Sequence, residues 1–111
     1  MKPLKYEHKS VLLDETIENL KIEKNGKYVD LTLGGGGHFG AIYEKLGNEA
    51  VLVGVDRDAA AIANSKEKYK NAPFKIIFVH NNFKNVSEII KMHTLENIDG
   101  FIMDQIGRAH V

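Results

Sequence analysis

Residues 27–40 read KYVDLTLGGGGHFG: a short apolar run leads into four consecutive glycines, with an acid before them and a histidine after them. The run predicts a strand over 27–33, and the residues after the glycines predict a helix over 38–47, ended by Gly47. Glycine permits positive φ and lets a ligand approach the backbone, while the first turn of a following helix offers free N–H groups. The stretch therefore predicts a strand and a helix joined by a loop suited to a ligand.

Strands and helices alternate along the rest of the chain. Further strands are predicted from the apolar runs at 51–56, 74–80 and 98–104. Helices are predicted at 11–21, 57–69 and 84–93. Strands that alternate with helices at this spacing favour right-handed crossovers and a parallel sheet covered on both faces. The fold class is therefore α/β and Rossmann-like, with about four parallel strands and flanking helices.

Length and composition limit the kinds of function that this chain can have. Its 111 residues are the size of one ordinary domain, and fifteen basic residues balance fifteen acidic ones. The charge balance gives no overall field that would attract a phosphate backbone or a membrane surface. The lack of cysteine excludes disulfides and thiolate metal sites, and the histidines show no metal-ligand spacing. No apolar run approaches the ~20 residues of a membrane span, so we expect a cytoplasmic protein without a membrane partner.

The unusual residues of the sequence lie where the predicted strands end. In open parallel sheets ligands bind beyond the carboxyl ends of the strands. The residues at these ends are Gly34 to Gly37, Asp56, Asn81, Asn82, Phe83 and Asp104. Asp56 follows the glycine loop at the offset, about twenty residues, of an acid that accepts hydrogen bonds from both ribose hydroxyls. The spacing therefore predicts a nucleoside-binding site.

Two kinds of nucleoside cofactor fit this pattern. The glycines satisfy the dinucleotide pattern G-x-G-x-x-G, but a run of four glycines satisfies many patterns. Asp30, with Gly34 and Gly36, gives D-x-x-x-G-x-G and places a carboxylate near the end of the first strand. That charge would repel a pyrophosphate and would attract the sulfonium and ammonium groups of S-adenosylmethionine. S-adenosylmethionine is favoured; an NAD-dependent oxidoreductase and a noncatalytic nucleoside-binding module remain alternatives.

Each of the singled-out residues also has a plain structural alternative. His38 could simply begin a helix, and Asp56 could cap the helix that follows it. Asp30 could satisfy nearby backbone N–H groups, and Phe83 could belong to the core rather than stack on an adenine. These alternatives are compatible with ligand binding, so only the structure can weigh them.

Four segments of the chain resemble one known family. They are YEHKSVLLDE (6–15), DLTLGGGGH (30–38), VDRD (55–58) and IDGFIMD (98–104). They are similar to the opening third of the bacterial small-subunit ribosomal RNA methyltransferase H family, whose members methylate the N4 amine of a cytosine in 16S ribosomal RNA. The resemblance implies a class I S-adenosylmethionine-dependent methyltransferase fold, of which this chain holds the N-terminal half. It also implies that the partner is the small ribosomal subunit.

The same resemblance implies a set of cofactor contacts. They are Gly36, Gly37, His38, Asp56, Phe83 and Asp104, to which the pattern above adds Asp30 and Gly34. In amine methyltransferases the group that binds the amine commonly follows the fourth strand, so Asp104 is the one candidate for a catalytic role here.

The resemblance ends at Asp104. The next residues, QIGRAHV (105–111), do not match the family, and IGRAHV is the translation of a common sequencing-library adapter. We therefore expect 1–104 to be a partial S-adenosylmethionine-binding domain and 105–111 to be a non-native tail. Such a fragment is expected to be inactive. Its fourth strand would be an exposed edge with Phe101, Ile102 and Met103 uncovered, so we also expect poor solubility or a homodimer.

Overall fold

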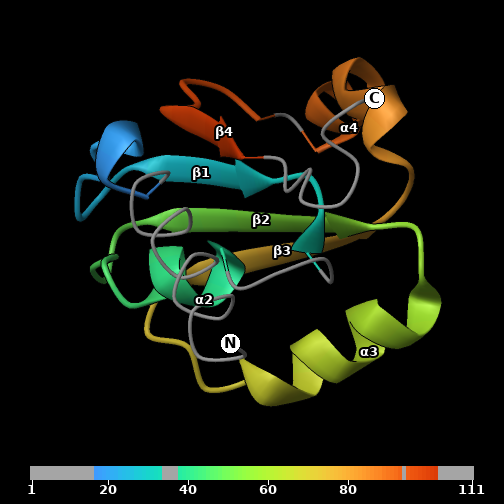
Figure 1. The fold of residues 1–111 in the computed structure, drawn as a ribbon, viewed down its shortest axis with the longest axis horizontal. Coiled ribbons are helices and arrows are strands. Elements are labelled where there is room, and N and C mark those ends of the chain that lie inside the picture. Colours follow the sequence, from blue (N-terminus) through green and yellow to red (C-terminus); the bar gives the residue numbers. More distant parts are fainter. Residues whose placement is uncertain (1–16, 34–37, 94, 103–111) are drawn as a thin grey trace, which may run out of the picture.

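A computed structural model of the chain describes residues 17–33, 38–93 and 95–102. The elements, in chain order, are β1 (Lys27–Asp30), α2 (His38–Tyr43), β2 (Val51–Asp56), α3 (Ala59–Lys68), β3 (Lys75–His80), the 3₁₀ helix η2 (Phe83–Asn85), α4 (Val86–Met92) and β4 (Gly100–Ile102) (Figure 1). Residues 17–20 are also helical, so the described part of the predicted helix 11–21 agrees with the prediction. The predicted alternation of strands and helices is confirmed.

The strands form one parallel sheet in the order β3-β2-β1-β4. β1 lies between β2 and β4, so that Val29 is paired with Val53 on one side and Phe101 on the other. The chain therefore moves outward from β1 through β2 to β3 and then returns to the opposite side of β1. This reversal is a topological switch point, and in open α/β sheets the ligand crevice lies at the carboxyl ends of the strands on either side of it.

Helices cover both faces of the sheet: α2 and α3 lie on one face, and α4 lies on the other. The buried residues on the side of α2 and α3 include Phe39, Ile42, Leu52 and Ile62. Those on the side of α4 are Val29, Val53, Val55, Val79 and Ile89. Successive residues of a strand point to opposite faces. β2 is therefore buried on both faces, which explains its continuous apolar sequence.

Two elements, β1 and α2, end earlier than predicted. β1 ends at Asp30 rather than at residue 33, since the Asp30 carboxylate accepts a hydrogen bond from the Thr32 N–H at 2.9 Å and turns the chain. α2 ends at Tyr43, before Gly47, whose N–H donates instead to the Lys24 carbonyl at 2.6 Å. The prediction that Gly47 ends this helix is wrong.

The fourth strand begins later than predicted, at Gly100 rather than at residue 98. The backbone around Asp99 is held by β1 in another way: its N–H donates to the Lys27 carbonyl at 2.8 Å, and its carboxylate accepts from the Lys27 N–H at 2.8 Å. The strand was predicted to extend to residue 104, but residues 103 and 104 lie outside the described part of the chain.

β4 is an edge strand of the described sheet, as the sequence predicted for a fragment. Phe101 is 43% exposed, which agrees with the prediction. Ile102 is only 5% exposed, because its side chain packs into the buried cluster that includes Ile17 and Tyr28; the prediction that it is uncovered is wrong. Met103 lies outside the described residues. No helix among the described residues is long and apolar enough to cross a membrane.

Gly54 of β2 lies where the sheet packs closely on Phe39 of α2. A Cβ atom at this position would lie 2.9 Å from Cε2 of Phe39 and 3.1 Å from Cδ1 of Leu33, and both of these side chains are buried. We expect Gly54→Ala to lower the free energy of unfolding by about 1–3 kcal/mol, because the core must shift to admit the methyl group. Urea unfolding followed by circular dichroism measures this change.

A matched control for this variant is Gly40→Ala in α2. There the nearest atom to an added Cβ is the Tyr69 hydroxyl oxygen at 3.3 Å, at the end of a side chain that can shift. Alanine is also the better helix former by about 1 kcal/mol. We expect no loss of stability, and an equal loss in both variants would contradict the explanation by close packing.

Candidate nucleoside site at the carboxyl ends of the strands

Asp30 ends β1 at the switch point and is almost completely buried, with 1% of its surface exposed. One carboxylate oxygen accepts the Thr32 N–H at 2.9 Å. The next residue, Leu31, donates its N–H to the Ile102 carbonyl of β4 at 2.8 Å. The alternative that Asp30 satisfies backbone N–H groups is therefore confirmed. Its carboxylate nevertheless lies at the end of an inner strand of the sheet, with only Leu31, Thr32 and Leu33 between it and the glycines in sequence.

Asp56 ends β2 and is only partly buried. One of its carboxylate oxygens accepts the Asp58 N–H at 2.9 Å, and Asp58 in turn accepts the Ala60 N–H at 2.9 Å. Asp58 is thus the N-cap of α3, and the alternative that Asp56 caps this helix is wrong. The bond from Asp58 instead fixes the orientation of the Asp56 carboxylate at the strand end.

The capping role of Asp58 gives a testable stability change. Asp58→Ala removes the acceptor for the Ala60 N–H. We expect a loss of about 1 kcal/mol in the free energy of unfolding, since caps of this type contribute about 0.5–2 kcal/mol. Asp58→Ser keeps an acceptor and is the control, measured by thermal unfolding in parallel. An equal loss in the serine variant would show that the hydrogen bond to Ala60 is not the cause.

A network of asparagines follows β3. The Asn81 N–H donates to the Asp56 carbonyl at 2.9 Å, which ties this segment to the end of β2. The Asn81 side-chain oxygen accepts from the Asn82 N–H at 2.7 Å and from the Asn85 amide at 2.9 Å. The Asn82 side chain accepts the Lys84 N–H at 2.9 Å and caps η2. This network fixes the backbone at Phe83, the first residue of η2; the side chain of Phe83 lies outside the described part.

Sequence reasoning named Asn81 and Asn82 only as residues of a strand end, and it missed Asn85 altogether. Three asparagines within five positions were the available signal, because asparagine side chains commonly satisfy backbone groups in turns. The helix predicted over 84–93 is observed as η2 followed by α4. The asparagine network explains why the helix is divided into two parts. Its hydrogen bonds to Asn82 and Asn85 stabilise the 3₁₀ turn η2, and the α-helix begins only after it, at Val86.

His38 is the first residue of α2, and only 6% of its surface is exposed. Its Nδ1 atom is buried and has no hydrogen-bond partner within the described part of the chain. A buried polar atom without a partner costs about 1–3 kcal/mol, so native structures rarely leave one without a reason. The alternative that His38 simply begins a helix accounts for its position but not for this buried nitrogen. A hydrogen-bonding ligand would account for both.

The predicted site residues are thus only partly located. Asp30, His38, Asp56 and the backbone of Phe83 are described, whereas Gly34, Gly36, Gly37 and Asp104 lie outside the described residues. Backbone pairing brings the end of β1 beside β2 and β4, since Asp30 is paired with Gly54 and Ile102. In the described part, no group of three histidines or carboxylates could hold a metal ion.

Comparisons with known proteins agree with this geometry. The sequence pattern of the MraW methylase family matches residues 5–107, so the match runs past Asp104, where the resemblance was expected to end. A ribosomal RNA small subunit methyltransferase H of Clostridium botulinum strain Okra is 48% identical over 101 residues, which are 91% of this chain and 32% of that protein. The protein of the same name in Acetivibrio thermocellus is 43% identical over 103 residues, covering 91% of this chain and 33% of its own length. The chain therefore spans about one third of the curated relatives that it matches.

One solved structure is similar in fold. It is the crystal structure of a candidate rRNA methylase from Clostridium thermocellum, with a TM-score of 0.60 and 21% sequence identity. The match covers 68% of this chain and 43% of that one. At this level of identity the likeness supports the Rossmann-like methyltransferase fold alone.

Proposed function

Because this chain belongs to the MraW methylase family, we propose that it is the cofactor-binding part of an S-adenosylmethionine-dependent methyltransferase. Its substrate would be the N4 amine of a cytosine in 16S ribosomal RNA of the small ribosomal subunit, in the cytoplasm. The observation that carries the proposal is the 48% identity over 91% of the chain to a protein named ribosomal RNA small subunit methyltransferase H. The chain spans only 32% of that relative, so the activity belongs to a longer protein.

Three observations support S-adenosylmethionine as the ligand. The Asp56 carboxylate is held at the end of β2 by the Asp58 N–H, and carboxylates at this place in such folds accept hydrogen bonds from ribose hydroxyls. The buried Nδ1 atom of His38 needs a partner. The Asp30 charge at the end of β1 favours a cation over a pyrophosphate. When bound, S-adenosylmethionine would supply an activated methyl group for transfer to the cytosine amine.

The proposed contacts follow from these observations and from the family resemblance. They are Asp30, Gly34, Gly36, Gly37, His38, Asp56, Phe83 and Asp104. Asp56 would bind the ribose and Asp30 would favour the positive charge, while the asparagine network would hold the backbone at Phe83 in place. Asp104 is the one proposed catalytic candidate, because it would follow β4 beside the substrate.

Isothermal titration with S-adenosylhomocysteine and with NADH separates this proposal from an NAD-dependent oxidoreductase. S-adenosylhomocysteine is chosen because it has no methyl group to transfer. We expect heat of binding with S-adenosylhomocysteine and none with NADH. The reverse result would favour the oxidoreductase, for which the family gives no support.

The second experiment uses the complete gene. We propose that residues 1–104 are a partial domain, that 105–111 are not native, and that the reading frame continues at the genomic locus. The complete product should transfer a radiolabelled methyl group from S-adenosylmethionine to small ribosomal subunits, and the 111-residue chain should not. A genomic frame that stops after Val111 would overturn the proposed tail. Methylation by the short chain would overturn its proposed inactivity.

The 111-residue chain is also proposed to dimerise or to precipitate through β4. Its outer edge is unpaired in the described sheet, and Phe101 is 43% exposed beside it. Sedimentation velocity should show dimers or larger species, and Phe101→Lys should shift the protein toward monomer. A stable monomer of the unchanged sequence would contradict this expectation.

A further inference from the structure

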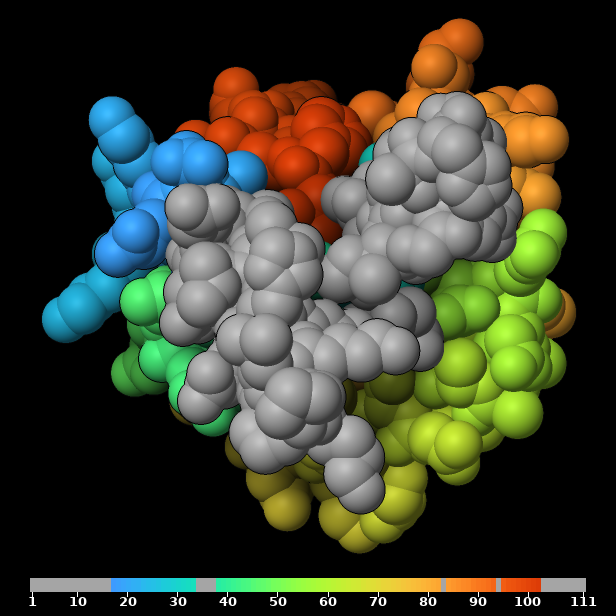
Figure 2. All heavy atoms as spheres, in the orientation of Figure 1, coloured from blue at the N-terminus to red at the C-terminus, as the bar shows by residue number. Residues whose placement is uncertain are grey.

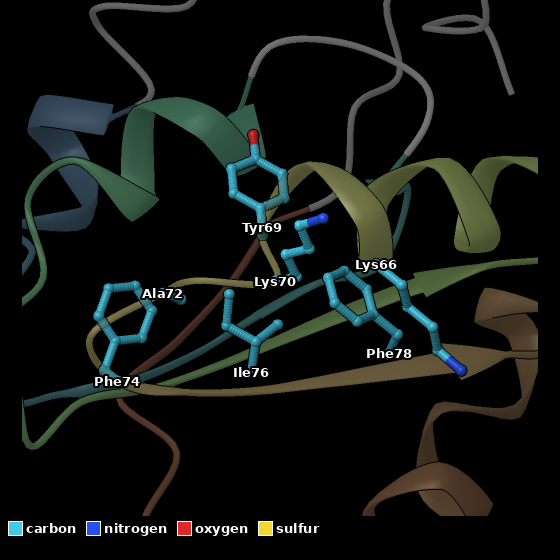
Figure 3. Close-up of a pocket in the computed structure, with 7 residues that line it drawn as sticks. All are labelled: Lys66, Tyr69, Lys70, Ala72, Phe74, Ile76 and Phe78. Atoms are coloured by element: carbon cyan, nitrogen blue, oxygen red, sulfur yellow. The ribbon is translucent and has the colours of Figure 1, made fainter.

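A concave surface lies between the end of α3 and one face of β3. This α3–β3 groove has a volume of about 270 Å³ and is lined by Lys66, Tyr69, Lys70, Ala72, Phe74, Ile76 and Phe78 (Figure 3). Ile76 and Phe78 alternate along β3 and therefore lie on one face of it, and Phe74 comes directly before the strand. The close-up shows Phe74, Ile76 and Phe78 in a row, with Lys66 extending from α3 and Lys70 from the turn that follows it.

The α3–β3 groove is separate from the nucleoside site because of the direction of α3. This helix begins at its cap Asp58, beside Asp56 at the carboxyl end of β2, and runs to Tyr69 at its other end. The groove surrounds that far end and the start of β3. Its volume is also below the roughly 300–1,000 Å³ of typical small-molecule pockets, so its shape suits part of a larger ligand lying along the surface.

The groove lies in the most basic part of the chain. Four lysines and one glutamate lie between residues 66 and 75. Over 57–84 there are six basic and two acidic residues, whereas the remainder has nine basic and thirteen acidic ones. The exposed α3 and the segment before it form a continuous strip on the right and lower surface of the molecule (Figure 2). The balanced net charge of the chain therefore hides a local positive surface.

The ammonium groups of the two groove lysines, Lys66 and Lys70, can pair with a negatively charged ligand. Lys66 has no hydrogen bond or ion pair among the described residues. Lys70 is paired with Glu67 at 2.6 Å, but both side chains are more than half exposed, and such surface pairs are weak and easily replaced. Lys68 lies next to the groove, with its ammonium group 5.4 Å from the centre of the Tyr69 ring.

Contacts between tilted aromatic rings support the apolar wall of the groove. The Tyr69 ring lies 5.0 Å from that of Phe39 and 4.7 Å from that of Tyr43. Phe74 lies 5.1 Å from Tyr43, and Phe78 lies 5.8 Å from Phe39. Ile76 and Phe78 are only partly buried, and part of each side chain is exposed to the groove. A basic groove with aromatic side chains is the arrangement by which proteins bind single-stranded nucleic acid.

We propose that the α3–β3 groove binds a single-stranded segment of the RNA substrate, with phosphates on Lys66 and Lys70 and a base against the apolar side chains of β3. The proposal rests on the proposed function, which makes RNA the substrate. A second copy of the chain fits less well, because two such lysine surfaces would repel each other. An acidic peptide paired with the open edge of β3 is the competing ligand, and it lacks bases for the aromatic wall.

The test measures RNA binding to the 111-residue chain by fluorescence anisotropy. The probe is a labelled single-stranded RNA of about 12 nucleotides, within the range covered by one small domain. The groove variant is Lys66→Ala/Lys70→Ala. Its control is Lys24→Ala/Lys91→Ala, which removes the same charge from exposed positions in the loop before β1 and on α4. Circular dichroism confirms that both variants keep the fold.

We expect the groove variant to bind the RNA roughly tenfold more weakly at about 50 mM salt, and the control to change little. The slope of log affinity against log salt should fall by about 0.7 for each lost phosphate contact. Equal weakening in both variants, or no RNA binding by the unchanged chain, overturns the proposal. So does equally strong competition by a poly-glutamate peptide of the same charge.

Titration of the same variants with S-adenosylhomocysteine separates this proposal from the proposed function. The groove lysines lie at the far end of α3 from Asp56, so cofactor affinity should be unchanged in both variants. Loss of RNA binding with unchanged S-adenosylhomocysteine affinity supports the groove. An unchanged chain that binds RNA through the groove but never binds S-adenosylhomocysteine would instead refute the proposed cofactor and leave the groove supported.

Discussion

Asp56→Asn is expected to lower the affinity of the chain for S-adenosylhomocysteine by about 10- to 100-fold, since a hydrogen bond to a charged group contributes about 1.5–3 kcal/mol. The amide oxygen of asparagine can still accept the Asp58 N–H, which the Asp56 carboxylate accepts at 2.9 Å. The other carboxylate oxygen, however, is replaced by an NH₂ group, which cannot accept a hydrogen bond from a ribose hydroxyl. The variant therefore removes a ligand contact while it keeps the turn. Isothermal titration measures the change.

The matched control is Asp58→Asn, two residues away. It also removes one negative charge, but its side-chain oxygen can still cap α3 through the Ala60 N–H. We expect little change in affinity for S-adenosylhomocysteine. If the two variants weaken binding equally, general electrostatics rather than contact with the ribose would be responsible. If neither does, Asp56 is not a ribose ligand.

Ile89→Ala is expected to lower the free energy of unfolding by about 2–5 kcal/mol, the usual cost of a large-to-small change in a core. Ile89 is completely buried against Val29, Val53, Val55 and Val79 of the sheet. α4 has only seven residues, and no side chain caps its N-terminus. So short a helix is not stable by itself and depends on this contact. Urea unfolding measures the loss.

Ile90→Ala is the control, because the neighbouring side chain is only partly buried. We expect a smaller loss, about 1 kcal/mol. α4 continues directly from η2 and the asparagine network, so Ile89→Ala should also weaken S-adenosylhomocysteine binding more than Ile90→Ala does. Equal losses of stability in the two variants would show that α4 is not anchored through Ile89.

The parts of the fold that depend on burial could be predicted from the sequence. β2 was predicted at 51–56 and is observed at Val51–Asp56, because a strand covered on both faces must be apolar throughout. The ends of the other elements depend on bonds between distant residues, which periodicity does not report. Gly47 bonds to Lys24, and Asp99 bonds to Lys27, and neither partner is near in sequence.

The candidate site was predicted less completely, for two physical reasons. Asp56 and Asp58 are both acids before a helix, and either could cap it; the extended backbone of Asp58, with φ −101° and ψ 113°, decides between them. The Nδ1 atom of His38, which has no hydrogen-bond partner among the described residues, can be recognised as unusual only when its burial is known. The sequence singled out His38 by resemblance, whereas its buried nitrogen gives an independent reason.

The α3–β3 groove was missed because net charge is an average over the chain. The equal numbers of acidic and basic residues argued against contact with nucleic acid by this segment. Four lysines and one glutamate lie between residues 66 and 75, so a local surface can be basic in a neutral chain. A charge count in short windows would have revealed the cluster.

The reversal of strand order at β1 has a consequence for the order of folding. β1, β2 and β3 pair with neighbours in sequence, whereas β4 pairs with β1 from far along the chain: Lys27 of β1 and Asp99, directly before β4, are hydrogen-bonded across 72 positions. Long-range pairing of this kind is slow, since a long loop must close first. During synthesis, β1 to β3 can therefore assemble before β4 is available. We expect β4 to dock last during folding and to detach first during unfolding. A nucleoside bound at the ends of β1 and β4 would therefore stabilise the fold chiefly by lowering the rate of unfolding.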